Sequence, residues 1–160
     1  RFLKQFKFSG NDGGLKTNLQ GIIAACKKMS ASHTGALIVL QRNNSLDFVK
    51  NTGDEMNLEV NQPIIESIFF KNSPLHDGAM IIEENRITAT RVILPVSNDK
   101  KIPLRFGLRH RAAVGITEKT DAVCLVVSEE NGQISYLKDG DFVLFEDTEE
   151  LMKILKKDLS

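Results

Sequence analysis

The sequence predicts an α/β domain built on a mixed, mostly antiparallel β-sheet flanked by α-helices. Three observations support this fold class: a segment with helical spacing near the start of the chain, several short strand-like segments in the middle, and an amphipathic helix at the end. The chain has 160 residues, which is a usual size for one domain and enough to bury a sizeable core. We therefore expect one domain with a helix near each end.

The first helix is predicted from apolar residues that recur every three or four positions. They are Leu15, Leu19, Ile22, Ile23, Cys26 and Met29. We expect Asn11 or Asp12 to cap this helix and residues 30–32 to end it. The short apolar segment that follows, residues 35–41, is typical of a buried strand. Periodicity is weak in residues 43–60, and we predict no element there.

The rest of the chain continues the alternation of helices and strands. Pro63 suits the first turn of a short helix over residues 64–70. Another short helix is expected at residues 109–118, and Asp147 with Glu150 forms a capping-box-like start for the final helix. Further strands are predicted over residues 78–83, 86–94, 122–127, 133–138 and 141–145. Together with the first strand they would form the sheet.

Composition and charge exclude several classes of protein. The chain is 41% hydrophobic and 26% charged, which argues against wholesale disorder. Its formal net charge of +0 argues against binding nucleic acid mainly through bulk electrostatics. No strongly apolar segment approaches the ~20 residues that a membrane-spanning helix needs. Cys26 and Cys124 have no CxxC partner, so we expect two buried free thiols.

Positive charge gathers near the start of the chain. The first 50 residues contain eight Lys/Arg and two Asp/Glu, whereas the remainder contains thirteen and nineteen. One explanation is a solvated face; the other is that Arg1, Lys4 and Lys7 follow a membrane helix on its cytoplasmic side. We expect residues 1–13 to be a juxtamembrane linker and residues 14–160 to form the domain.

A first group of candidate site residues lies where a loop enters the strand predicted at residues 78–83. Asp77 is suited to act as a general base or to bind a divalent cation, with His76 as a second ligand. Gly78 and Ala79 would let a ligand approach the backbone closely. The alternative is a simple turn, because Asp-Gly is among the commonest turn dipeptides.

The second group, Arg109-His110-Arg111, opens a predicted helix. Two guanidinium groups beside a helix N-terminus can hold a triphosphate through bidentate hydrogen bonds and backbone N–H groups. The alternatives are a solvated basic stretch and a contact with nucleic acid.

The third group, Ser128-Glu129-Glu130, follows an apolar strand. One of its carboxylates could bind the same cation as Asp77, or the group could be a polar strand end that leads into a hairpin turn. The usual phosphate-loop, dinucleotide, zinc-protease and hydrolase motifs do not occur in the sequence.

Taken together, the three groups resemble the diadenylate cyclase domain, also called the DGA/RHR domain, which makes cyclic di-AMP from ATP. The matching text is SPLHDGA at residues 73–79, RHRAA at 109–113 and VSEE at 127–130. Either short motif alone is weak, but the set is specific. The likeness runs from about Gly14 to Leu155 and is nearest to the membrane-anchored CdaA-type enzymes, whose catalytic domain follows transmembrane helices.

The resemblance implies the site residues and their roles. The catalytic positions are Asp77, Gly78 and Ala79. The residues that bind the ATP phosphates are Arg109, His110, Arg111 and Ser128. Those that contact adenine or ribose are Leu94, Gly78 and Leu108. The ligands of a divalent metal, Mn²⁺, Mg²⁺ or Co²⁺, are Asp77, His76 and Glu130.

The resemblance also implies the partners of the domain. Two ATP molecules would condense to cyclic di-AMP and two pyrophosphates, each ribose 3′-hydroxyl attacking the α-phosphorus of the other ATP. One domain holds one ATP in this family, so catalysis requires a face-to-face homodimer, as the chemistry itself suggests. We expect a cytoplasmic domain whose parent is anchored in a bacterial cell membrane, with no nucleic-acid partner.

Two positions depart from the family pattern. Leu108 stands where many members have Thr, which removes a hydroxyl from the site. Ile93 stands where CdaA-type enzymes often have Tyr, which replaces an aromatic stacking surface by aliphatic packing. Two other functions stay open: a non-catalytic regulatory module that binds ATP or cyclic di-AMP, and nucleic-acid binding through Arg109 and Arg111.

Overall fold

The computed structural model describes residues 16–99 and 101–160. The strands are β1 (Ala36–Gln41), β2 (Asp54–Glu59), β3 (Ala79–Glu83), β4 (Arg86–Val92), β5 (Val123–Val127), β6 (Ile134–Lys138) and β7 (Asp141–Val143). The helices are α2 (Leu19–Ala31), α3 (Asp47–Lys50), α4 (Gln62–Phe69), α5 (Leu108–Lys119) and α6 (Thr148–Leu159).

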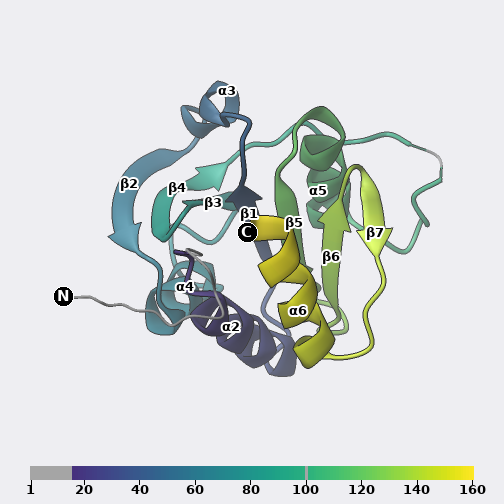
Figure 1. Ribbon diagram of the computed structural model, residues 1–160, viewed down its shortest axis with the longest axis horizontal. Coiled ribbons are helices and arrows are strands. Elements are labelled where there is room, and N and C mark those ends of the chain that lie inside the picture. The colour runs from purple at the N-terminus through teal and green to yellow at the C-terminus, as the bar shows by residue number, and fades with distance from the viewer. Residues whose placement is uncertain (1–15, 100) are drawn as a thin grey trace.

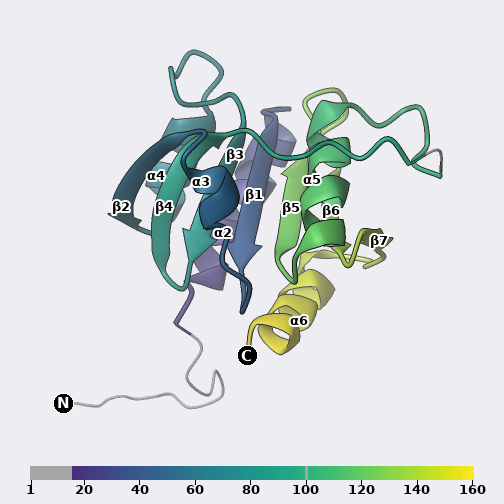
Figure 2. The same ribbon diagram turned by 90° about the horizontal axis from the view of Figure 1, so that it is seen from above.

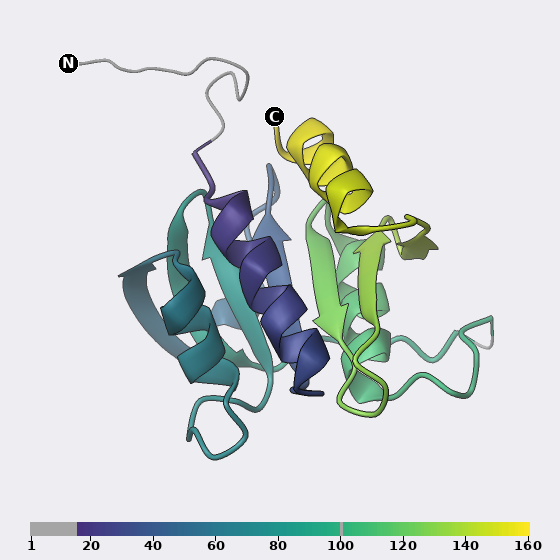
Figure 3. The same ribbon diagram turned by 90° about the horizontal axis from the view of Figure 1, so that it is seen from below.

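The strands form one sheet in the order β2-β4-β3-β1-β5-β6-β7. Of the strand pairs in the described residues, β1 and β3 are parallel and the others are antiparallel. The helices α2, α4 and α6 cover one face of the sheet (Figures 1 and 3). The other face carries α3 and α5, and the long connection from β4 to α5 crosses it (Figure 2). The predicted fold class, a mixed and mostly antiparallel sheet flanked by helices, is confirmed.

Each face of the sheet has its own hydrophobic cluster. Along β1, Ile38 and Leu40 belong to the cluster under α2, α4 and α6, whereas Leu37 and Val39 belong to the cluster under α3 and α5. This division follows from strand geometry, because successive side chains point to opposite faces. All four side chains are at most 3% exposed to solvent.

Side-chain caps fix where the outer helices begin. Asn18 caps α2 by accepting a hydrogen bond from the Gly21 N–H at 2.9 Å. The predicted caps Asn11 and Asp12 are therefore wrong, because a residue of the same capping type stands directly before Leu19. The prediction for the last helix is confirmed, since the Asp147 carboxylate accepts a hydrogen bond from the Glu150 N–H at 2.9 Å.

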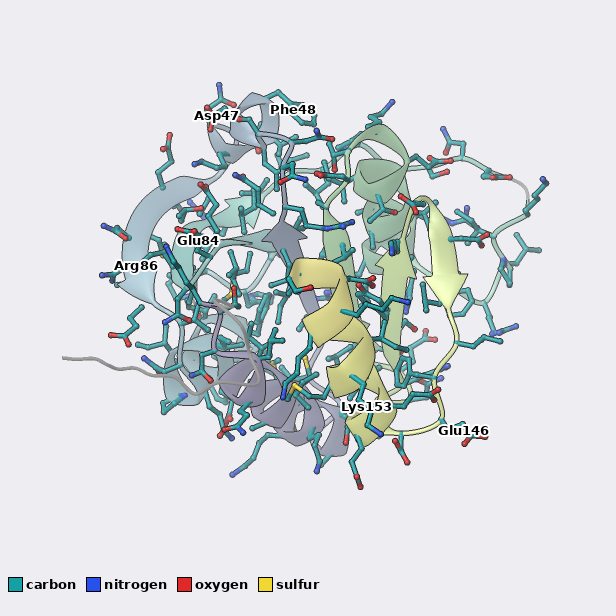
Figure 4. The ribbon with its side chains drawn as sticks, in the orientation of Figure 1. Asp47, Phe48, Glu84, Arg86, Glu146 and Lys153 are labelled. Carbon is teal, nitrogen blue, oxygen red and sulfur yellow. The ribbon has the colours of Figure 1, made fainter. Side chains whose placement is uncertain are left out.

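Other boundaries differ from the predictions by a few residues. The strand β4 ends at Val92, two residues early, where Arg91 adopts a φ of +54° and the pairing with β3 shifts register. Two elements were not predicted: β2 forms one edge of the sheet, and α3 packs on the face that also carries α5. Asp47 and Phe48 of α3 project away from the sheet (Figure 4). Predictions for residues 1–13, including the juxtamembrane linker, lie outside the described residues.

Two further predictions concern the whole chain. Cys26 and Cys124 are both buried and free, as expected. Among the residues that the structure describes, no helix combines the length and apolar character needed to cross a membrane.

Candidate active site

A cavity of about 760 Å³ opens on the face of the sheet that carries α5. Its walls include Leu37 of β1, Val92 of β4, Val127 of β5 and the first turn of α5. The cavity brings together eight residues that the sequence predicted: Asp77, Gly78, Leu94, Leu108, Arg109, His110, Ser128 and Glu130. Its volume lies within the range of small-molecule binding sites. Segments that are distant in sequence thus meet at one hollow.

Three predicted residues do not line the cavity. Ala79 is completely buried at the start of β3, where it pairs with Val92. Arg111 contributes its backbone carbonyl, which accepts a hydrogen bond from the Ser97 N–H at 3.0 Å and ties the β4–α5 connection to α5. His76 lies beside the cavity, next to Asp77.

The backbone at Gly78 determines where Asp77 stands. Gly78 has a φ of +87°, and a Cβ added there would lie 2.7 to 2.9 Å from backbone atoms of Arg91. Any side chain at this position would meet both strain and overlap. The side chain of Asp77, the residue before this glycine, is 86% exposed and lines the cavity.

The residues His76 and Asp77 form a pair that fits a divalent metal. The His76 Nδ1 lies 2.8 Å from the Ser73 carbonyl oxygen, and its Nε2 lies 3.7 Å from Asp77 Oδ1. A ring that donates from Nδ1 to a carbonyl keeps the Nε2 lone pair available as a metal ligand. The described part of the chain contains no group of three or more such ligands. Two such ligands leave the other positions of a divalent metal to donors from outside this pair.

Arg109 is held in place from two sides. Its Nη1 lies 3.2 Å from Glu129 Oε1, and its side chain is 25% exposed. The flat guanidinium lies against Gly35, where an added Cβ would be 2.5 Å from the Arg109 Cζ. A glycine just before β1 thus makes the room that this guanidinium occupies.

The first turn of α5 is open to an anion. Gly107 occupies the N-cap without any side-chain hydrogen bond, and the turn contains no acidic residue. The first N–H groups of a helix have no partner within the helix, and the helix dipole favours negative charge there. Because Leu108 and Arg109 of this turn line the cavity, these groups lie next to it.

His110 is a buried neutral ring rather than a cation. It is 6% exposed, and its ring lies 4.6 Å from Phe106 and 6.2 Å from Phe142. Its Nε2 has no hydrogen-bond partner among the described residues. Burial, followed by the positive charge of Arg109, lowers the pKa of His110 to about 4. Any contact that His110 makes with a phosphate at neutral pH would therefore lack its charge.

Ser128 shapes the loop that carries the acidic pair. Its Oγ accepts hydrogen bonds from the N–H groups of Glu130 and Asn131 at 3.2 and 3.4 Å. The end of α2 secures the same loop, because Ser30 Oγ donates to the Gly132 carbonyl at 2.5 Å. The loop is thus fixed between α2 and β5.

Several cavity residues escaped prediction. Arg105 lines the cavity, and its Cζ lies 4.6 Å from the centre of the Phe106 ring. Leu104, 95% exposed, also belongs to the wall. Glu129 was identified as a metal ligand candidate, but its pairing with Arg109 was not foreseen. The only sequence signal for Arg105 is a cation beside an aromatic residue in an irregular segment.

Comparison with known proteins identifies the family. The family model described as "DAC: DisA bacterial checkpoint controller nucleotide-binding" matches residues 23–142. The chain belongs to this family. The resemblance noted in the sequence is thereby confirmed.

Sequence similarity to named diadenylate cyclases supports the same family membership. The chain is 43% identical to diadenylate cyclase CdaS of Bacillus thuringiensis over 74% of its own length and 59% of that protein. It is 40% identical to a diadenylate cyclase of Listeria monocytogenes over 88% of its length and 52% of that protein. The chain therefore spans little more than half the length of these relatives.

Solved structures show the same fold. The crystal structure of a double mutant of DacA from Staphylococcus aureus has a TM-score of 0.85 and 38% identity, covering 88% of this chain and 94% of that one. A hypothetical membrane spanning protein from Bacillus cereus has a TM-score of 0.79 and 38% identity, covering 85% of this chain and 67% of that one.

Proposed function

We propose that this chain is the catalytic domain of a diadenylate cyclase, which condenses two ATP into cyclic di-AMP and releases two pyrophosphates. The observation that carries the proposal is the meeting of Asp77, Arg109 and Glu130 in one cavity, although they come from three separate segments. The names of the relatives point to the same activity.

The chain's own residues supply the parts that nucleotidyl transfer needs. Asp77 accepts the proton of the ribose 3′-hydroxyl as the oxygen attacks the α-phosphorus of the other ATP. Arg109 and the N–H groups at the start of α5 bind the phosphates and stabilise the negative charge that develops on them. Pyrophosphate leaves opposite the attacking oxygen. His110, Arg111 and Ser128 remain predicted phosphate contacts, and Gly78 and Ala79 form the backbone beside Asp77.

An apolar part of the cavity suits the adenine ring. Leu94 is 5% exposed and lines the wall, while Ile93 and Leu108 are 70% and 75% exposed beside it. Aliphatic side chains can cover a base by packing, without the stacking that an aromatic residue would add. Leu108 contributes no hydroxyl, so phosphate binding at this point falls to backbone N–H groups.

A divalent metal, Mn²⁺, Mg²⁺ or Co²⁺, would be held by Asp77 and His76, with Glu130 as the predicted third ligand. The described residues do not bring these three side chains together as one metal-binding group, so oxygens of the substrate phosphates would complete the shell. The orientation of the His76 ring, with its Nδ1 2.8 Å from a carbonyl oxygen, supports this assignment. When bound, such a metal lowers the pKa of a coordinated hydroxyl and offsets phosphate charge.

The reaction requires a second copy of the domain. Each ATP supplies both an attacking 3′-hydroxyl and an accepting α-phosphorus, but each hydroxyl attacks the other ATP, so two nucleotides must face each other. The cavity described above would hold one of them. A symmetric face-to-face dimer brings the two together. The Bacillus cereus protein is described as membrane spanning, which supports a membrane-anchored parent. A cytoplasmic position of this domain is part of the same proposal.

Mass spectrometry of the products tests the proposed activity. The purified domain is incubated with ATP and with Mn²⁺, Mg²⁺ or Co²⁺ in turn. We expect cyclic di-AMP, at a rate per protomer that rises with protein concentration because the dimer is transient. ATP binding without cyclic di-AMP or pyrophosphate under any metal would instead identify the non-catalytic regulatory module, a possibility that the missing hydroxyl at Leu108 keeps open.

A further inference from the structure

We propose that Arg105 is a further substrate-binding residue, which holds the terminal phosphates of the nucleoside triphosphate. This proposal rests on the proposed function, because it requires a triphosphate in the cavity. Arg105 lines the cavity from the segment just before α5, and Arg109 lines it from the first turn of that helix. Two guanidinium groups from one continuous stretch of chain therefore face the same space.

Arg105 is oriented by an aromatic stack. Its guanidinium lies 4.6 Å from the centre of the Phe106 ring. Phe106 is itself held between His110, at 4.6 Å, and Phe142 of β7, at 4.7 Å. A guanidinium that rests on a fixed ring loses less conformational freedom when it binds an anion. The contact with Phe106 thus orients the Arg105 guanidinium at the edge of the cavity, where its N–H groups can donate to a phosphate.

The charges of the cavity leave Arg105 available. The carboxylates among the lining residues are Asp77, Glu129 and Glu130, and Arg109 already pairs with Glu129 at 3.2 Å. Within residues 16–99 and 101–160, Arg105 forms no ion pair. A triphosphate brings several negative charges into a cavity where carboxylates outnumber guanidinium groups. An unpaired guanidinium at the rim is therefore the group best suited to bind it.

The position of Arg105 points to the terminal phosphates. The α-phosphorus must lie near the groups that activate the attacking hydroxyl, whereas the β- and γ-phosphates leave together as pyrophosphate. Arg105 is exposed, while the Arg109 side chain is three-quarters covered. The β- and γ-phosphates leave toward solvent, and the exposed Arg105 can stay bound to them as they do.

The test measures binding without turnover. Its probes are 3′-deoxy-ATP and 3′-deoxy-AMP, which lack the attacking hydroxyl, titrated by calorimetry into the 160-residue chain with Mg²⁺. We expect Arg105→Ala to weaken 3′-deoxy-ATP about tenfold, the typical loss of a charge-assisted hydrogen bond, and 3′-deoxy-AMP less than about twofold. Arg105→Lys keeps the charge but loses the planar guanidinium. Its affinity for 3′-deoxy-ATP should therefore lie between that of the parent chain and that of Arg105→Ala.

Lys101→Ala is the matched control. Lys101 is an exposed cation on the same connection and does not line the cavity, so its loss changes net charge without removing a proposed contact. It should bind both probes as the parent chain does. Thermal unfolding of each variant verifies that Arg105→Ala is folded.

Three outcomes would overturn the proposal. They are equal weakening of both probes by Arg105→Ala, equal effects of Arg105→Ala and Lys101→Ala, and no binding of 3′-deoxy-ATP by the parent chain. Failure of the proposed function looks different: the triphosphate would bind with the expected dependence on Arg105, but ATP would yield no cyclic di-AMP.

Discussion

The two faces of the sheet are packed in different ways. The cluster under α2, α4 and α6 contains large side chains, including Phe69 and Tyr136, both at most 2% exposed. The cluster under α3 and α5 contains many alanines: Ala79, Ala89, Ala112, Ala113 and Ala122. Small residues let α5 lie close to the β4–α5 connection, and at Gly115 an added Cβ would overlap the Pro95 carbonyl.

The two faces therefore have different roles: one stabilises the fold, and the other carries the candidate site. The first face is closed by three helices and contains few of the predicted site residues, whereas the second face leaves the cavity open at one end of α5. Substitutions in the first cluster should therefore lower the free energy of unfolding. Substitutions around the cavity should instead weaken substrate binding or slow turnover.

The largest effect is expected at Asp77. Replacement by Asn removes the proposed base, so the rate of cyclic di-AMP formation should fall by about 10²- to 10⁴-fold. Because the side chain is 86% exposed, the unfolding temperature should barely change. Asp47→Asn is the matched control, since Asp47 is 82% exposed on α3 and does not line the cavity. Normal turnover by Asp77→Asn would mean that Asp77 has another role.

A substitution on the first face should show the opposite pattern. Ile22 of α2 is completely buried, and Ile22→Ala should lower the free energy of unfolding by about 2 to 5 kcal/mol through lost burial and a cavity. Urea denaturation measures this change. The folded variant should bind 3′-deoxy-ATP with the affinity of the parent chain. Weakened binding at temperatures where the variant is folded would contradict the separation of the two faces.

His110 should make stability depend on pH. Burial and Arg109 lower the pKa of His110 to about 4, from an ordinary 6.5, so the unfolded chain takes up a proton before the folded chain does. The stability present above pH 6.5 is thus lost as pH falls toward 4, by up to about 3 kcal/mol.

Replacement of His110 by Phe removes the titrating group and keeps a ring beside Phe106. The free energy of unfolding, measured by urea denaturation at several pH values, should then vary less between pH 6.5 and 4 than in the parent chain. Parallel pH profiles for the two proteins would show that His110 does not titrate in this window.

The smallest effect is expected at Gly35. An added Cβ would lie 2.5 Å from Arg109 Cζ, so the guanidinium, at the end of a flexible side chain, would have to leave its place beside Gly35 and Glu129. The loss of this partly exposed ion pair costs little stability. Gly35→Ala should therefore leave the unfolding temperature nearly unchanged and weaken 3′-deoxy-ATP by about tenfold. In an Arg109→Ala background the same substitution should have no further effect. Additive losses would mean that Gly35 acts through something other than Arg109.

Local patterns predicted most of the fold. The apolar segment at β1 and the helical spacing in α2 each indicate their element from neighbouring residues alone. The elements α3 and β2 could not be predicted in this way. In β2 only Asp54 and Met56 are partly covered and the other residues are exposed, so hydrophobic alternation is faint there. This edge strand is specified by its pairing with β4, which is a tertiary interaction.

The candidate site was predicted from motifs rather than from physics. Asp77 and Arg109 were identified through their resemblance to a family, and either motif alone suited a turn or a basic patch. Their presence in one cavity depends on packing that no local pattern encodes. The place of Gly35 was missed for the same reason, because Arg109 is distant in sequence. The orientation of Arg105 was missed because the Phe106 ring beneath it packs on Phe142, which is also distant in sequence.

The pairing of β1 has a consequence for how the chain folds. This apolar strand lies in the middle of the sheet, where Ile38 pairs with Met80 on one side and with Leu125 on the other. Neither partner is near in sequence, so during synthesis β1 must wait until β3 and then β5 have left the ribosome. Long-range pairing of this kind slows folding, and the waiting strand is the segment most exposed to aggregation.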